Sequence, residues 1–479
     1  MKRGKLWSFA GSSIALLAAS LPSFGADLLS VYDQALENDP QIREADATRR
    51  ANREAKPQAL ANLLPGLSAS AGRTKQWSSG SGFSEIPVVD PVTGEVIRID
   101  RQPSGGDSSG ATTQWNLSLR QTLFSLPQFV ALASANRQVM QAEANFFAAQ
   151  QDLVQRVARQ YFAVLQAQDA VRAQEAARDA VARQLEQAER RFEVGLIAIT
   201  DVQEARAARD NAAAGVIGAK RTLASAEEQL RATIGTLPPS LNEPAANMPL
   251  LSPDPASADD WVKMAMEQNA ALVSSRLSAD IARDSVRSTY GGFTPEVTLT
   301  AGKSFSDSDN ERSGIGSTTL EGNSKSNGKS LGLSFSMNLN GLGYGNYSRT
   351  RQSQQRWIAA KASLERVSRD TERQARDAYL GVKSEIERVQ ALRQSLESSR
   401  TALAATEAGY EVGTRTAVDV LSSRQQLIQA ETNYSSAKYS YLNNLIALRL
   451  AAGDLDRETL EEINRWLTPP PPPPPPAAQ

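Results

Sequence analysis

One short motif occurs twice in this chain, as Phe192-Glu193-Val194-Gly195 and, 218 residues later, as Tyr410-Glu411-Val412-Gly413. Each copy ends a long helical pattern, and a glycine in that place favours a left-handed C-terminal cap. A new helix can start soon afterwards, because Thr200 and Thr416 each have an amide or acidic side chain three residues on, the spacing of a capping box. The sequence therefore predicts a helical hairpin at each glycine, although an ordinary well-capped turn would show the same residues.

The motif belongs to a longer internal repeat. At an offset of 230 residues, Glu37-Asn38-Asp39 aligns with Glu267-Gln268-Asn269, and Pro65 aligns with Pro295. A period this long is too large for one solenoid unit and indicates a duplicated half-protein. Each half shows the order helix, strand, loop, strand, long helix, turn, helix. The change of offset from 230 to 218 places the length difference in the loops.

These patterns predict the boundaries of five regions: a signal peptide, two repeats, a linker between them and a tail. The first repeat (27–240) is expected to hold a helix, strands at about 66–77 and 112–124 around a loop at 78–111, a long helix at about 128–193, a turn at 194–199 and a helix at 200–235. The second repeat (261–455) is expected to hold a helix, strands at about 295–306 and 330–340 around a loop at 307–329, a long helix at about 346–411, a turn at 412–415 and a helix at 416–452. The remaining regions are the signal peptide (1–26), a linker or equatorial segment (241–260) and a tail with a polyproline run (456–479).

The two long helices carry a coiled-coil pattern. At 1.5 Å per residue, each would reach roughly 100 Å, more than one globular core can cover. Apolar residues recur every seven positions, a spacing typical of helices that pack along one another. The pattern also fits a plain fibrous coiled coil. The residues that carry it are Val139, Phe146 and Leu153, then Val157, Val164 and Val171, and in the second half Val382, Val389, Leu396 and Leu403.

The strand patterns alternate between apolar and small polar residues. Leu331, Leu333 and Phe335 are separated by Gly332 and Ser334, a period of two that is typical of a strand between lipid and water. An amphipathic strand of a soluble sandwich would look the same. If the strands span a membrane, four per chain cannot close a barrel, since the smallest known have about eight strands. The chain would then oligomerise, and the residues alone do not choose between two copies and three.

The composition excludes several classes of function. A basic start, an apolar stretch from Leu6 to Leu21 and small residues up to Ala26 indicate an export signal. The chain has no cysteine and no histidine, which removes disulfides, thiol chemistry and most transition-metal sites. The net charge of −1 does not indicate a nucleic-acid-binding protein. We find no catalytic constellation, and therefore expect no enzyme activity, no cofactor and no metal site.

Two longer runs resemble a known family. They are Arg191-Phe192-Glu193-Val194-Gly195-Leu196-Ile197-Ala198-Ile199-Thr200-Asp201-Val202 and Ala408-Gly409-Tyr410-Glu411-Val412-Gly413-Thr414-Arg415-Thr416-Ala417-Val418-Asp419-Val420-Leu421. Both are similar to the turns of the TolC-type outer-membrane channel-tunnels of efflux and type I secretion. The likeness extends over nearly all of the chain after the signal peptide.

The resemblance implies a mixed α/β membrane protein. Its expected form is a homotrimer with a 12-stranded β-barrel, four strands from each chain, continued by a 12-helix coiled-coil α-barrel in the periplasm. The expected location is the outer membrane of a Gram-negative cell, in contact with its lipid. The expected partners are a periplasmic membrane-fusion adaptor and an inner-membrane transporter of the ABC or RND type.

The resemblance also assigns roles to individual residues. The periplasmic gate would be closed by polar links among Thr200, Asp201, Tyr410 and Arg415. The adaptor would dock beside Gly195 and Gly413. The family has two acidic rings at its constriction, matched here by Asp419 and by Ser422, so the second ring lacks its carboxylate.

Two function classes fit the sequence. The first is an exit duct for efflux, type I secretion or both, opened when its partners dock. The second is a structural, adhesin-like trimeric coiled coil without a conduit. The duplicated strand pattern and the paired turns favour the duct, while the cargo is not encoded in any recognisable motif.

Overall fold

The computed structural model describes residues 26–245, 247–314 and 319–469 of the 479-residue chain. The chain divides into two compact units, each assembled from both halves of the sequence. The first unit takes residues up to 43, then 149–269, then 371 onward, and the second takes 44–148 and 270–370. The predicted signal peptide, apart from Ala26, and the proline run from Pro470 lie outside the described residues.

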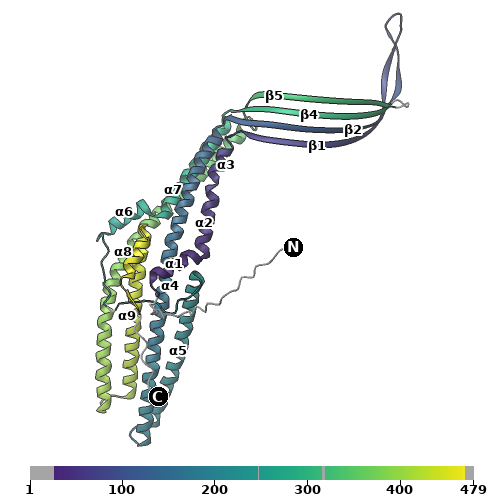
Figure 1. The fold of residues 1–479 in the computed structure, drawn as a ribbon. Helices are drawn as coiled ribbons and strands as arrows, with labels where there is room; N and C mark the ends of the chain where they lie inside the picture. The colour runs from purple at the N-terminus through teal and green to yellow at the C-terminus, as the bar shows by residue number, and fades with distance from the viewer. Residues whose placement is uncertain (1–25, 246, 315–318, 470–479) are drawn as a thin grey trace, which may run out of the picture. The chain divides into compact units, whose positions relative to one another are not determined.

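Two pairs of helices repeat the same plan. α4 (Leu126–Glu193) and α8 (Tyr344–Glu411) each hold 68 residues, and α5 (Ile199–Ile234) and α9 (Ala417–Ala452) each hold 36. Each long helix is joined by a short turn to its shorter partner (Figure 1). The equal lengths confirm the predicted duplication, and the long helices begin within two residues of the predicted positions.

The predicted heptad positions form the interior of the first unit. Leu153, Val157 and Val164 of α4 are 0 to 1% exposed, and Val382 and Val389 of α8 are 0 and 3% exposed. Burying one such side chain contributes roughly 1.5–3 kcal/mol. The two heptad positions before Leu153 lie in the second unit and are only half-buried in a single chain. Helix-to-helix packing therefore stabilises the first unit.

Short elements surround these helices in the first unit. They are α1 (Leu28–Asn38), β3 (Glu243–Pro244), α6 (Ala258–Gln268), α10 (Arg457–Asn464) and β6 (Leu467–Thr468), with β3 paired to β6. The buried Tyr161 of α4 fixes this layer by donating to the carbonyl oxygen of Asn242 at 2.8 Å. The predicted linker at 241–260 thus contains β3 and the start of α6.

The other helices are α2 (Pro40–Arg53), α3 (Ala55–Ala61), α7 (Ala270–Tyr290) and the 3-10 turn η1 (Gly291–Phe293). The first helix of each repeat is interrupted at an aligned residue. Asp39 ends α1 with a ψ of 121°, and Asn269 ends α6 with a ψ of 120°. Pro40 follows the first break and starts α2, and the counterpart at Asn269 shows that the break was duplicated with the rest.

The sheet lies in the second unit and has four antiparallel strands. They are β1 (Gly66–Val89), β2 (Val96–Phe124), β4 (Glu296–Gly314) and β5 (Thr319–Ser336), in the order β1-β2-β4-β5 (Figure 1). β1 and β5 are the edges, and each presents a row of backbone groups without a partner strand in the sheet of a single chain.

The strands extend far into the segments predicted as loops. β1 and β2 pair from Gly66 to Val89, so the predicted loop at 78–111 is strand except for a turn at 90–95, and most of 307–329 is strand as well. The many glycine and serine residues of these segments favour loops, because both residue types dominate turns. Antiparallel pairing depends on backbone groups, so it continues through small residues when the partner strand is long enough. β5 in turn ends at Ser336, four residues before the predicted end.

The two faces of the sheet differ in chemistry. Directly opposed residues share a face, and one row consists of Leu67, Leu119, Ala301 and Leu331. The next row, on the opposite face, contains Ser68, Ser118, Gly302 and Ser330. The predicted alternation is confirmed. Among the described residues, no helix has an apolar stretch long enough to cross a bilayer.

Candidate functional site

The two repeated glycines lie in the turns that join the paired helices of the first unit. Gly195 has a φ of +77° and Gly413 a φ of +78°, both in the left-handed region that L side chains rarely adopt. A Cβ at either position would meet no atom within 4 Å. Backbone conformation therefore requires glycine here, as the sequence predicted, and open space lies beside both turns.

The turn after α8 is closed by a complete capping box. The Thr416 hydroxyl accepts a hydrogen bond from the backbone N–H of Asp419 at 3.2 Å, and the Asp419 carboxylate accepts from the backbone N–H of Thr416 at 2.9 Å. The prediction of a capping box at Thr416 is confirmed. Asp419, expected in a constriction ring, thus has a structural role in each chain as well.

The turn after α4 lacks this device, so the capping box predicted at Thr200 is wrong. α5 starts two residues earlier than that box would allow, with Ala198 as its N-cap and no side-chain hydrogen bond at the cap. Thr200 and Asp201 lie inside the first helical turn, where a carboxylate is favoured by the helix dipole. Because neither side chain is used for capping, both are available for contacts beyond their own helix.

This difference predicts unequal costs for matched substitutions. Thr416→Ala is expected to destabilise the protein by about 1 kcal/mol, because it removes an N-cap hydrogen bond. Thr200→Ala is expected to cost less than half as much, since no cap is lost. Denaturant unfolding of the two variants tests this, and equal losses would contradict the assignment of the caps.

The predicted gate residues come from both repeats, and the structure brings a further residue to them. The guanidinium carbon of Arg191, near the end of α4, lies 4.7 Å from the ring centroid of Tyr410, near the end of α8. This is a cation–π contact between the two hairpins. Within the described part of one chain, no hydrogen bond is recorded that joins Thr200 or Asp201 to Tyr410 or Arg415. The sequence analysis assigns no role to Arg191, although Arg191 is the first residue of the run that resembles a channel-tunnel turn.

Arg415 is fixed by the fold of its own turn. Its backbone N–H donates to the Gly409 carbonyl at 3.2 Å, as does that of Thr414 at 2.8 Å. A Cβ on Gly409 would lie 2.8 Å from the Cγ of Arg415 and 3.2 Å from the hydroxyl of Thr414. Gly409 therefore leaves room for the turn to fold back over α8, which determines where the Arg415 side chain begins.

The two predicted constriction residues occupy different surroundings. Hydrogen bonds from the Thr416 backbone and hydroxyl hold the pKa of Asp419 below its ordinary value of 3.8. Ser422 is exposed and lines a groove of about 580 Å³ between α4, α5 and α9. Neighbours in that groove include Val181 of α4, Asn211 of α5 and Gln425 of α9.

Farther from the turns, a polar cluster joins the two helix pairs. The Tyr439 hydroxyl of α9 donates to the Asp169 carboxylate of α4 at 2.9 Å, and Ser435 donates to the same oxygen. Arg172 pairs with Asp169 and also with Glu243 at 2.7 Å. Burial and the neighbouring Asp169 raise the pKa of Tyr439, so this tyrosine remains a hydrogen-bond donor. The cluster holds α9 to α4 well behind the turns.

A protein-family model matches both repeats. The model, described as "Outer membrane efflux protein", covers residues 31–236 and 261–454, which agrees with the division found in the sequence.

Individual relatives agree with this match. Outer membrane protein TolC of Vibrio cholerae is 32% identical over 455 residues, covering 95% of this chain and 97% of the relative. Alkaline protease secretion protein AprF of Pseudomonas aeruginosa is 31% identical over 469 residues, covering 96% and 91%.

Solved structures share the fold at lower identity. The outer-membrane channel OprN has a TM-score of 0.70 at 20% identity, covering 89% of this chain and 90% of its own. The Campylobacter jejuni outer membrane channel CmeC has a TM-score of 0.69 at 18% identity, covering 97% of both chains. The chain belongs to the outer membrane efflux protein family and is a homologue of TolC.

Proposed function

We propose that three copies of this chain form a passive exit duct in the outer membrane, through which an efflux or type I secretion system discharges its cargo. The observation that carries this proposal is the four-stranded sheet, which has one apolar face, one small-polar face and two open edges. Unpaired edges are not tolerated in hydrocarbon. Pairing the β1 edge of one copy with the β5 edge of the next closes the sheet and turns its polar face toward an interior passage.

The turns of the first unit supply the proposed gate. Arg415 and Tyr410 at one hairpin and Thr200 and Asp201 at the other can link neighbouring hairpins, within a chain or between copies. A carboxylate such as Asp201 can accept from a guanidinium and a phenol together, which is a charge-assisted arrangement. Each solvent-exposed polar link stabilises the closed state by about 0.2–1 kcal/mol. Summed over three copies, the links can hold a closed state that a docking partner is able to overcome.

Behind this gate, we propose a constriction with one acidic ring instead of two. Three copies of Asp419 would provide the ring, and Ser422 takes the place of the second carboxylate. Fewer negative charges attract cations less strongly. Binding of multivalent cations at the constriction should therefore be weaker than in a duct with both rings.

The turns also offer the proposed docking site for a periplasmic adaptor. Val194 and Val412, each beside a turn glycine, are 70% and 75% exposed. Exposed apolar side chains at both tips suit a partner that presents helical tips of its own. The partner pump, of the ABC or RND type, would supply the energy and choose the cargo.

Site-specific cross-linking tests the docking site. The chain has no native cysteine, so single variants Val194→Cys and Val412→Cys can be treated with a cross-linker in whole envelopes. Ile217→Cys, 72% exposed on α5 but far from the turn in sequence, is the matched control. We expect one periplasmic protein to be captured from both turns and not from position 217. Identical products at all three positions, or none at the turns, would remove the support for docking there.

A further inference from the structure

Two lysines lie directly opposite each other on neighbouring strands of the sheet. Lys303 of β4 pairs in register with Lys329 of β5, and both side chains are exposed. Like charges in directly opposed positions destabilise a sheet. No ion pair is recorded for either lysine within the described part of the chain. The pair therefore destabilises the sheet locally unless an anion lies between the two ammonium groups.

The lysines share the apolar face of the sheet. One row toward the helices lie Ala301 and Leu331, and one row toward the far end lie Trp115 and Phe305, whose ring centroids are 6.3 Å apart. Each row advances by about 7 Å along the strand. The Lys303 ammonium lies 5.8 Å from the Trp115 ring.

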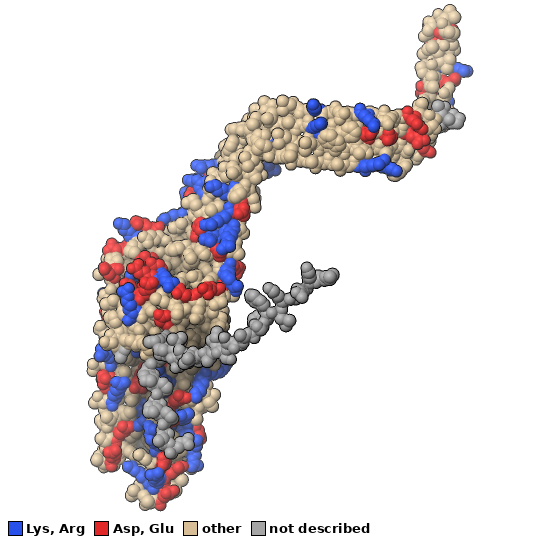
Figure 2. Space-filling model, in the orientation of Figure 1, with Lys and Arg blue, Asp and Glu red and all other residues tan. Residues whose placement is uncertain are grey.

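The lysine pair lies at the boundary between the mostly uncharged part of the sheet and its charged far end. In Figure 2 the sheet is mostly tan near the helices, and charged atoms gather toward its far end. Lysine beside an aromatic row, at the edge of an apolar band, is typical of the region where hydrocarbon meets lipid headgroups.

Neighbouring strands do not supply a counter-ion. Beside Lys303, on β2, the same row holds Leu117. The nearest carboxylate of β4 on this face is Asp307, two rows farther on, and Lys325 already pairs with it at 3.3 Å.

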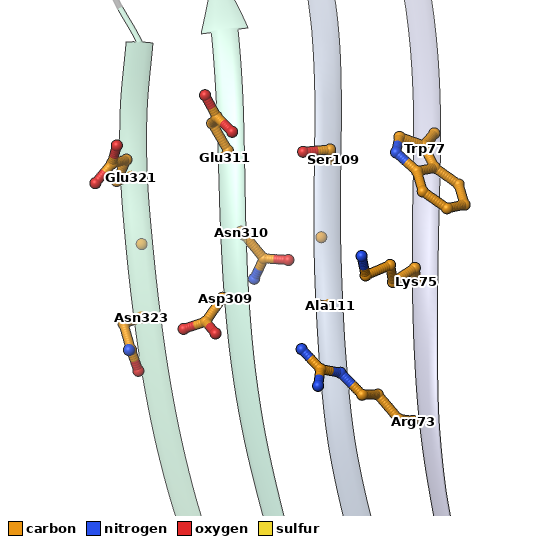
Figure 3. A pocket seen from close by; sticks show the side chains of 12 residues that line it. Arg73, Lys75, Trp77, Ser109, Ala111, Asp309, Asn310, Glu311, Glu321 and Asn323 are labelled. Carbon is orange, nitrogen blue, oxygen red and sulfur yellow. The ribbon is translucent and has the colours of Figure 1, made fainter.

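A second copy of the chain would not supply one either. Its β1 edge, placed against β5, would bring the cations Arg73 and Lys75 and no Asp or Glu before Glu85. Figure 3 shows Arg73 and Lys75 on β1 at one side of a hollow of about 660 Å³. The carboxylates that line this hollow, Asp309, Glu311 and Glu321, lie three or more rows beyond the lysine pair. Among the described residues, neither this sheet nor a β1 edge placed beside it brings a carboxylate next to the lysine pair, which leaves an external anion as the counter-ion.

We propose that Lys303 and Lys329 together bind the phosphate of a phosphorylated lipid headgroup in the outer leaflet of the membrane. Opposed Cβ atoms on paired strands are about 5 Å apart, so two flexible lysine stems can place their ammonium groups on either side of one phosphate. The stems cover apolar surface while the charged ends reach the headgroup level. This inference rests on the part of the proposed function that turns the apolar face toward lipid, and it is independent of the gate.

Lipid binding by the purified oligomer tests the proposal. The probes are a bis-phosphorylated glucosamine lipid, the same lipid without phosphates, and inorganic phosphate, with binding followed by native mass spectrometry. We expect the first to bind and the other two to bind far more weakly. The double variant Lys303→Gln/Lys329→Gln should bind the phosphorylated lipid roughly thirtyfold more weakly, because a lysine near an anionic lipid surface is worth about fivefold.

Two matched variants make the result specific. Lys303→Arg/Lys329→Arg keeps both charges and should retain binding, while Lys263→Gln/Lys383→Gln removes two exposed lysines from α6 and α8 and should have no effect. Unchanged lipid binding by Lys303→Gln/Lys329→Gln would overturn the proposal. So would a loss of oligomer stability in that variant without a loss of lipid binding, since it would assign the lysines to a contact between copies. Normal conductance of the variant in either case would leave the proposed duct intact.

Discussion

Replacing Tyr410 by Phe and Arg415 by Glu in the same chain is expected to raise single-channel conductance several-fold. The phenylalanine loses the hydroxyl donor, and the glutamate places a negative charge where a positive one would face Asp201. With links of about 0.2–1 kcal/mol each and three copies, the closed state loses on the order of 3 kcal/mol. A change of that size alters the ratio of open to closed channels by roughly 150-fold. Planar-bilayer recording of the purified variant measures it.

Two further variants separate the gate from general damage. Arg415→Lys keeps the charge at the turn and should retain most of the closed state. Arg393→Glu reverses an exposed charge on α8 about five turns before the end of that helix, and should leave conductance unchanged. A double variant with the wild-type conductance would show that these residues do not hold the passage closed.

Removing the carboxylate of Asp419 is expected to abolish most of the preference for cations. Three copies of this carboxylate would form the proposed acidic ring, since Ser422 contributes no charge. Asp419 also caps α9, so Asp419→Ala removes both the charge and a cap acceptor. Asp419→Asn keeps an oxygen that can accept from Thr416 and isolates the effect of the charge. Both variants should lose selectivity in reversal-potential measurements, and selectivity equal to the wild type in Asp419→Asn would exclude the ring.

The same carboxylate gives the selectivity a defined pH dependence. Hydrogen bonds to the ionised form hold the pKa of Asp419 below 3.8, so the group stays charged to a more acidic pH than a free carboxyl. Cation preference should persist as the pH falls to about 4 and disappear only below the ordinary carboxyl value. The reciprocal variant Ser422→Asp restores a second ring and should increase the preference at neutral pH.

Much of the fold could be predicted from periodic patterns. The seven-residue spacing indicates α4 and α8 because buried contact positions recur with the helical turn, and the turn glycines mark where both helices end. Strand lengths could not be predicted in the same way. Residues 78–85 and 100–110 are rich in glycine and serine, and only the pairing with a partner strand shows that they continue β1 and β2.

The sequence predicts individual residues of the site but not the contacts between them. Gly195 and Gly413 could be assigned because a left-handed backbone strongly favours glycine. The prediction of a capping box at Thr200 is wrong because α5 begins at Ile199, which makes Ala198 the N-cap residue. The contact between Arg191 and Tyr410 joins residues more than 200 positions apart, and no local pattern encodes which side chain faces the tyrosine.

Single-channel recording of the purified wild-type protein in a planar bilayer tests the central claim most directly. A gated duct predicts a small, persistent conductance that prefers cations, and a much larger one in the Tyr410→Phe/Arg415→Glu variant. A coiled-coil envelope protein without a conduit predicts no channels from either protein. The absence of conductance in both, with the oligomer intact, would contradict the account.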